Sequence, residues 1–207
     1  MKKTFIIFII LSSFCGYSQN FGGGFYFGLS TSQINGDNLG GYNLPGLNIG
    51  GFTDYNFSER SKIQLELAFL QKGARDAISD SSSFNKVRLN YLEIPLIYSY
   101  RWNQLSLEIG PALDILINSK EESNGFEIES NPPYYNFSLS GIVGLNWRFT
   151  NKISISFRTN NSISLIREAN VPVGTGPNAI QILSPGQRNL CLNFALIYNR
   201  EDCFLFQ

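Results

Sequence analysis

Residues 89–117 read LNYLEIPLIYSYRWNQLSLEIGPALDILI, and this stretch decides the fold through its alternation of side chains. Leu and Ile occupy most odd positions from Leu105 to Ile117, whereas the even positions carry mainly polar or small residues. Because successive side chains of a strand point to opposite faces, the stretch predicts two strands joined at Asn103 and Gln104. Each strand has one continuous apolar face. Such a face packs on a soluble core or contacts lipid, and a strand that crosses a bilayer needs about 9–11 residues.

Composition narrows the class of protein. Only 15% of the 207 residues are charged, whereas 17 Phe, 10 Tyr and 19 Gly indicate an aromatic-rich sheet. The formal net charge is zero, so nothing favours a nucleic-acid partner. The absence of histidine excludes His-containing zinc sites and Ser-His-Asp triads. We expect no cofactor.

The N-terminus resembles an export signal. Two lysines precede an apolar run from Phe5 to Leu11, and small residues suit cleavage near Ser18. Phe14 before Cys15 disfavours a lipoprotein signal, which wants a small residue there. We therefore predict a signal peptide at 1–18 and one mature domain at 19–207. No later segment has about 18 uninterrupted apolar residues, so any membrane crossing must be made by strands.

The mature chain contains eight segments that alternate like the opening stretch. They lie at about 22–30, 47–57, 63–69, 89–102, 105–117, 135–149, 153–165 and 190–198. Their connections run long, short, long, short, long, short, long, which is typical of outer-membrane barrels with short periplasmic turns. Aromatic residues gather beside the short turns: Tyr55, Phe57, Tyr100, Trp102, Trp147, Phe149 and Tyr198. The chain is thus predicted to be all-β, an eight-stranded antiparallel up-and-down transmembrane β-barrel in the outer membrane.

A family resemblance rests on the motif in the fourth segment. The motif consists of Tyr91, Leu92, Glu93, Ile94, Pro95 and Leu96. With the LSLEIGPALDIL sequence that follows, it resembles the PorT-like outer-membrane β-barrel family of Bacteroidetes. The resemblance implies an eight-stranded outer-membrane barrel. It implies no particular activity, because only some members of that family are tied to protein secretion.

If the apolar faces contact lipid, several charged side chains must point into the barrel. The parity of a residue, meaning its odd or even position in the alternation of its strand, gives the face to which its side chain points. The charged residues with inward parity are Asp54, Glu66, Glu93, Arg101, Glu108, Asp114, Arg148 and Arg158. The lumen of an eight-stranded barrel is just wide enough for side chains to fill, and an unpaired buried charge is costly. We expect a salt-bridged plug made of Glu66, Glu93, Arg101, Glu108, Arg148 and Arg158. Catalysis by paired carboxylates is the alternative, and it would need substrate access to this lumen.

Other residues give weaker signals. The long connections contain seven acidic residues: Asp37, Asp76, Asp80, Glu121, Glu122, Glu127 and Glu129. Their carboxylates could bind calcium or magnesium or simply be solvated. We expect no metal site. Residues 125–129 alternate, which predicts that the fifth and sixth strands extend as a ribbon above the membrane. Cys191 and Cys203 could form a disulfide, but two free thiols are favoured because they lie 12 residues apart in extended chain.

The predicted function is that of a non-enzymatic outer-membrane barrel with a charged, plugged lumen and long extracellular loops. It would serve envelope structure, adhesion or docking to a secretion apparatus. Expected partners are outer-membrane lipid, the outer-membrane insertion machinery, and other envelope or secretion proteins. Two alternatives are an outer-membrane lipid-modifying enzyme and a periplasmic barrel that binds a small ligand. The second would need an apolar lumen and a polar exterior.

Overall fold

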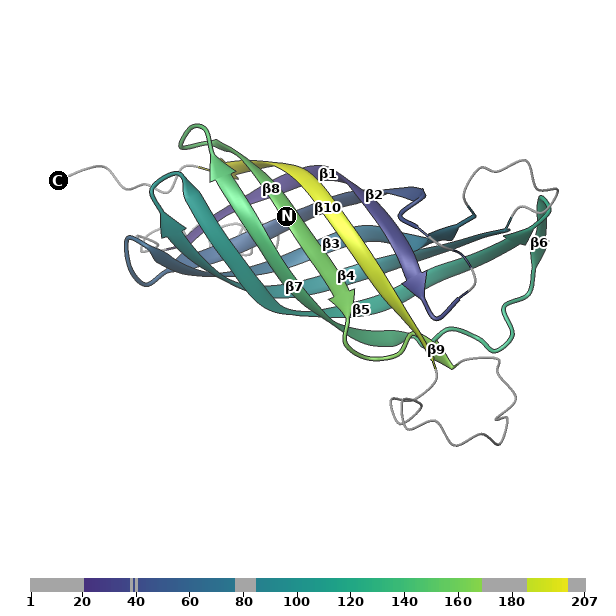
Figure 1. The fold of residues 1–207 in the computed structure, drawn as a ribbon. Coiled ribbons are helices and arrows are strands. Elements are labelled where there is room, and N and C mark those ends of the chain that lie inside the picture. The colour runs from purple at the N-terminus through teal and green to yellow at the C-terminus, as the bar shows by residue number, and fades with distance from the viewer. Residues whose placement is uncertain (1–20, 38, 40, 77–84, 169–185, 201–207) are drawn as a thin grey trace, which may run out of the picture.

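The computed structural model describes residues 21–37, 39, 41–76, 85–168 and 186–200, and this part of the chain is built almost entirely of strands (Figure 1). The strands are β1 (Phe21–Asn35), β2 (Leu44–Asn56), β3 (Ser61–Arg75), β4 (Asn85–Trp102), β5 (Leu105–Ser123), β6 (Phe126–Ile128), β7 (Phe137–Arg148), β8 (Ile153–Ser162), β9 (Arg167–Glu168) and β10 (Gly186–Arg200). The described residues contain no helix long and apolar enough to span a bilayer.

Eight long strands form one closed antiparallel barrel. Their order around the barrel is β1-β2-β3-β4-β5-β7-β8-β10, and β10 pairs with β1 to close it. The short strands β6 and β9 pair with the ends of β5 and β10. The predicted fold class, an all-β eight-stranded up-and-down barrel, is therefore confirmed.

The strand ends differ from prediction on the side of the long connections. There β3 runs to Arg75, β4 begins at Asn85 and β5 continues to Ser123, so these strands are longer than predicted. The expected continuation of the seventh strand to 165 is wrong, since β8 ends at Ser162. The predicted ribbon is present as the β5–β6 hairpin, but β6 is a separate short strand and not an extension of β7. The three short connections between neighbouring long strands lie at the other end, at 57–60, 103–104 and 149–152 (Figure 1).

The two faces of the barrel wall have opposite chemistry. Phe27, Leu107 and Phe157 point outward, and their side chains are 58%, 53% and 52% exposed. Many other large apolar side chains are also exposed. Their neighbours on the same strands point inward and are buried, as the alternating burial pattern shows. At the short-turn end aromatic rings contact each other on the outer face, with centroids 4.9 Å apart for Phe21–Tyr55 and 5.4 Å for Trp147–Phe149. This arrangement fits an interfacial aromatic girdle.

One bulge changes the parity of β5. Tyr91 of β4 pairs with Leu116, but Asn90 pairs with Asn118, so Ile117 is an extra residue in the ladder. Because a one-residue slip moves the following side chains to the other face, Glu121 points inward and is 8% exposed. Glu121 and its neighbour Glu122 belong to β5, not to a loop as the sequence suggested.

The apolar exterior predicts a depth-dependent cost for an outward charge. We expect Phe157→Arg, in the middle of β8, to destabilise the barrel in lipid vesicles by about 2–4 kcal/mol. Ile153→Arg, on the same face at the first residue of β8, should cost only about 0–1 kcal/mol because it lies near the interface. Urea unfolding in vesicles measures both, and equal costs would contradict a lipid-facing exterior.

Candidate functional site in the barrel lumen

Arg158 forms the first bridge across the lumen. Its Nε lies 2.6 Å from Glu108 Oε2, and its Nη1 lies 2.9 Å from Glu66. Arg158 is on β8 and Glu66 on β3, which are four strands apart around the barrel and therefore on opposite walls. All three side chains are buried. Arg158 thus gives each of the two buried carboxylates a cationic partner, and its charge-assisted hydrogen bonds hold the two walls together.

Register and a glycine explain how Arg158 reaches Glu108. Glu108 is directly opposite Gly144 on β7, and Gly144 is directly opposite Arg158 on β8. The side chain of Arg158 crosses the space that a residue-144 side chain would fill, since a Cβ there would lie 2.5 Å from Arg158 Cγ. The missing side chain at Gly144 therefore permits the bond between strands that are not neighbours.

Two neutral side chains complete the environment of Glu66. The Tyr26 hydroxyl donates to Glu66 Oε2 at 2.9 Å, and Gln64 Nε2 donates to Glu66 Oε1 at 2.7 Å. The guanidinium of Arg158 also lies over the ring of Tyr26, with Cζ 6.0 Å from the ring centroid. With these bonds, both carboxylate oxygens of Glu66 have donors.

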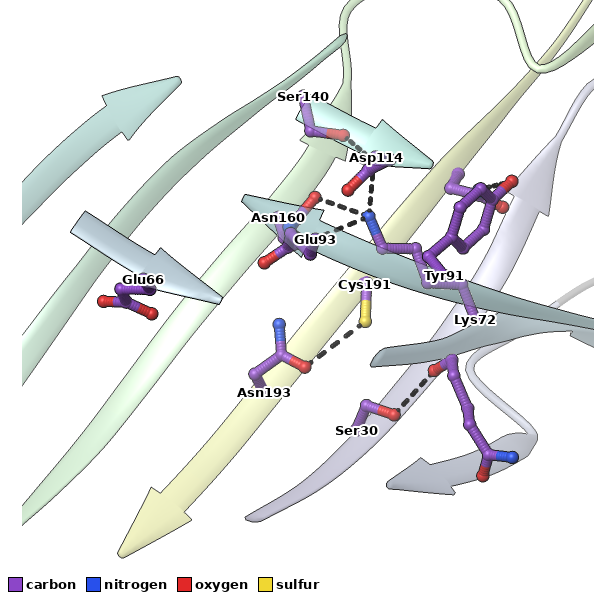
Figure 2. Close-up of polar contacts among 12 residues, drawn as sticks. Ser30, Glu66, Lys72, Tyr91, Glu93, Asp114, Ser140, Asn160, Cys191 and Asn193 are labelled. Carbon is purple, nitrogen blue, oxygen red and sulfur yellow. Dashed lines mark hydrogen bonds and ion pairs between the residues drawn. The ribbon is translucent and has the colours of Figure 1, made fainter. Parts of the chain in front are cut away.

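Lys72 forms a second bridge, farther toward the long connections (Figure 2). Its Nζ lies 2.8 Å from Asp114 Oδ2, 3.3 Å from Glu93 Oε2 and 3.0 Å from Asn160 Oδ1. Ser140 donates to the same Asp114 oxygen, and Asn160 donates to Glu93. Lys72 is fully buried. Since Asn160 is on β8, opposite β3, this bridge also spans the lumen.

The third bridge joins Tyr91 on β4 to β10 on the opposite wall. Asn189 Nδ2 donates to the Tyr91 hydroxyl at 3.2 Å. The ring of Tyr91 belongs to an apolar cluster that fills the mouth at the long-connection end: Ile34, Ala74, Leu89, Tyr91, Tyr134 and Ile166. Tyr134 and Ile166 come from the connections after β6 and β8, so these two segments fold inward over the lumen.

A polar contact fastens the two inward-folded segments to β5. Glu121 Oε1 accepts a hydrogen bond from the Tyr134 hydroxyl at 2.5 Å. The same oxygen forms an ion pair with Arg167 Nη1, also at 2.5 Å. The guanidinium of Arg167 lies 4.4 Å from the Tyr134 ring centroid. Burial and the bond to Glu121 raise the pKa of Tyr134 well above its usual range. The phenol thus remains protonated and continues to donate.

The structure separates the charge cluster predicted from the sequence. Glu66, Glu108 and Arg158 form the first bridge, and Glu93 belongs to the second. Arg101 lies at the short-turn end, where it donates to the main-chain oxygen of Glu59. Arg148 is the last residue of β7, four residues beyond the Gly144 that faces Glu108. The expectation that Arg101 joins the cluster is therefore wrong. Arg148 lies at a different height from Glu108 along the barrel, because alternation gives the face of a residue but not its height.

Sequence reasoning missed Lys72, the centre of the second bridge. The third strand was predicted to end near 69, so Lys72 was not tested for parity. It has the same parity as Gln64 and Glu66, and β3 continues past it to Arg75. Parity applied along the longer strand would have placed Lys72 in the lumen.

The family motif lies on β4 and contributes to both faces. Leu92, Ile94 and Leu96 point outward, whereas Tyr91, Glu93 and Pro95 point inward and are buried. Pro95 has no N–H, and the ladder with β3 is interrupted between the pairs Leu65–Leu96 and Ala68–Glu93. Two of the inward residues, Tyr91 and Glu93, take part in bridges across the lumen.

The remaining candidates have local partners. Glu122 pairs with Lys86 at 3.1 Å and Glu127 with Lys120 at 3.3 Å. Asp76 accepts hydrogen bonds from Asn85. Asp80 and Cys203 lie outside the described residues, as does the predicted signal peptide. Cys191 is a free thiol, buried in the lumen 3.6 Å from Asn193 Oδ1.

The lumen and exterior oppose one predicted alternative. A periplasmic barrel for an apolar ligand would have an apolar lumen. Here the lumen contains the three bridges and a wall of serines and asparagines, while large apolar side chains cover the outside. The structure therefore contradicts the small-ligand barrel.

Comparison with known proteins identifies the domain. Residues 17–167 match the family described as outer membrane protein beta-barrel domain. None of the curated proteins matches the sequence. Among solved structures, the chain is similar to Ail, the attachment invasion locus protein of Yersinia pestis, with 12% identity, a TM-score of 0.49, and coverage of 87% of this chain and 99% of that one.

Two further solved barrels are similar. Neisserial surface protein A has 10% identity and a TM-score of 0.47, with coverage of 86% of this chain and 96% of that one. OprG from Pseudomonas aeruginosa has 13% identity and a TM-score of 0.36, with coverage of 87% and 94%. At these identities the likeness concerns the fold.

The role of Gly144 can be tested by adding one methyl group. We expect Gly144→Ala to destabilise the protein by about 1–3 kcal/mol, because the new Cβ overlaps Arg158 and the neighbouring backbone. Gly51→Ala is the matched control on the outer face, where the nearest atom to a Cβ is 3.7 Å away. Urea midpoints of refolded protein measure both. A similar midpoint for the two variants would show that Arg158 does not need the space.

The first bridge predicts a strong coupling between two residues. Removing Arg158 alone leaves Glu108 buried without its cation, which should cost about 3–5 kcal/mol, whereas replacing Arg158 and Glu108 together by apolar residues should cost much less than the sum. A double-mutant cycle read by urea midpoint measures the coupling. The same cycle on Arg148 and Glu108 should be nearly additive. Additivity at Arg158 and Glu108 would contradict the bridge.

Proposed function

We propose that this chain, which belongs to the outer membrane protein beta-barrel domain family, is a non-enzymatic envelope protein that acts through its exposed surface. The chain is an outer-membrane barrel. The proposal assigns it a closed lumen and a role in envelope structure, adhesion or docking to a secretion apparatus. The single observation that carries the proposal is the set of three bridges that join opposite walls of the lumen.

The bridges leave little room for a path through the barrel. An eight-stranded barrel has an interior that side chains can fill, and here Arg158, Lys72 and Tyr91 each reach the opposite wall at a different height. The apolar cluster around Tyr134 and Ile166 then covers the mouth. This arrangement supports a lumen that is a structural core rather than a channel.

The same contacts argue against catalysis in the lumen. A general acid or base must reach its substrate within hydrogen-bond distance. Glu66, Glu93 and Glu108 are buried and bonded to other lumen side chains. The chain also lacks the histidine that usually activates a serine. We therefore favour a binding or structural role over the lipid-modifying enzyme.

The exposed parts of the barrel define where partners would bind. We assign the long connections to the outside of the cell and the short turns to the periplasm, because outer-membrane barrels have this asymmetry. Residues 1–18 would direct export, and outer-membrane lipid and the insertion machinery would be the first partners. The motif Tyr91–Leu96 supports a PorT-like member of the family, with other envelope or secretion proteins as docking partners.

Ion conductance tests the closed lumen. Purified protein inserted into planar bilayers should show no steady conductance, because the three bridges and the mouth cluster close the path. A porin inserted under the same conditions serves as the positive control, and co-flotation with liposomes shows that the protein has inserted. Steady conductance of the inserted wild-type barrel would overturn the proposed closure.

A further inference from the structure

The barrel wall has an opening beside the outer part of β5. β5 pairs with β7 as far as Ile115–Phe137, and it pairs with β6 only from Glu121–Ile128 onward. Between these ladders, no strand of the described chain pairs with residues 117–120 on this side. Figure 1 shows the connection from β6 to β7 running away from β5. We call the opening, with residues 117–120 as one side, the β5 window.

The window exists because the connection is held elsewhere. Tyr134 lies in the mouth cluster and donates to Glu121, so the chain around it cannot follow the edge of β5. It returns to the sheet only where Leu116 N donates to Asn136 O at 2.8 Å. The resulting hollow has a volume of about 520 Å³ and is lined by Ile117, Ser119, Ile128, Glu129, Pro133 and Tyr134, among others. This volume is within the range of about 300–1,000 Å³ that is usual for ligand sites.

The β5–β6 turn shows which main-chain groups face the window. Asn124 and Gly125 both have positive φ, 52° and 84°, as a two-residue type I′ hairpin requires. Ser123 and Phe126 close this hairpin as a hydrogen-bonded pair. Because hydrogen-bonding direction alternates along an antiparallel strand, Glu121 also faces β6, and Ser119 directs its N–H and C=O into the window.

We propose that the β5 window binds an extended peptide segment of a partner protein, which adds as a short strand to the main chain of Ser119. An unpaired strand edge is a template for such β-augmentation. The edge is recessed between the β7 and β6 ladders, so a single extended chain fits it better than the sheet of a second folded copy. The partner therefore presents a strand from a flexible segment.

The residues at the rim of the window indicate which side chains the bound segment should carry. Glu129 is exposed and has no ion pair with any described residue, while Lys120 of β5 pairs with Glu127. A lysine or arginine on the peptide would complement this charge. Ile117 and Ile128 are 60% and 47% exposed and offer apolar contact to alternate residues. The segment would thus alternate basic and apolar residues.

Peptide binding at the β5 window would be one form of the proposed docking role. It rests on the proposed function only in one respect, the side of the membrane on which the partner lies. Peptide binding by purified protein tests the window alone. Failure of the proposed function would appear as steady conductance, which is measured separately and does not involve the window.

The test uses acetyl-KVKVK-amide as the probe and ¹⁵N-labelled full-length protein in detergent micelles. We expect saturable binding with the largest amide shifts at 117–120. The same peptide methylated at the main-chain nitrogen of all five residues lacks these N–H donors and should bind about tenfold more weakly or worse. Acetyl-EVEVE-amide should also bind more weakly, because it opposes Glu129. Absence of binding at millimolar peptide, shifts centred elsewhere, or equal binding of the N-methylated peptide would each overturn the proposal.

A pair of variants tests the main chain of Ser119. Ser119→Pro removes an N–H that faces the window and leaves the ladder with β4 intact, so it should weaken binding about tenfold. Ser119→Ala changes the side chain but keeps the N–H, and it should bind like the wild type. Heat-modifiability on unboiled gels checks that both variants fold. If Ser119→Pro does not fold, the N-methylated peptide on wild-type protein decides, and undiminished binding to folded Ser119→Pro would overturn the proposal.

Discussion

The bond from Arg158 across the lumen to Glu66 and Glu108 is the interaction on which the barrel interior depends. An apolar exterior and strict alternation place every second side chain of each strand inside a narrow lumen. Charges placed there must be paired, because a buried charge without a partner is strongly destabilising. The register Glu108–Gly144–Arg158 meets this requirement by leaving one strand without a side chain at the crossing.

The bulge at Ile117 connects the lumen to the mouth. By reversing the parity of β5, one extra residue turns Glu121 inward, where it binds Tyr134 and Arg167. These contacts bring two connections over the lumen. The same contacts draw the chain away from β5 and leave residues 117–120 unpaired on one side. Closure of the mouth and opening of the wall are therefore two consequences of one local irregularity.

Alternation in the sequence predicted the fold well because a period of two is a local property. It gave the inward face of Glu66, Glu93, Glu108 and Arg158 correctly. It could not give the height of a residue in the lumen, since height depends on the stagger of strands that are far apart in sequence. Arg148 has the correct parity but lies at the end of β7. Lys72 was missed because the end of β3 is fixed by pairing with β4, which extends past the apolar stretch.

The two ends of the barrel differ in what they can offer a partner. At the short-turn end, polar groups are used locally: Arg101 donates to the main chain of Glu59, and the Ser58 hydroxyl accepts from Ser61 N. At the other end the strands continue past the closed part of the wall, and β5 carries a main-chain edge that its neighbours do not complete. Because side chains of the lumen are bonded mainly to one another, chemistry available to another protein lies on the outer surface. The β5 edge is a part of that surface where main-chain groups, rather than side chains alone, face a hollow.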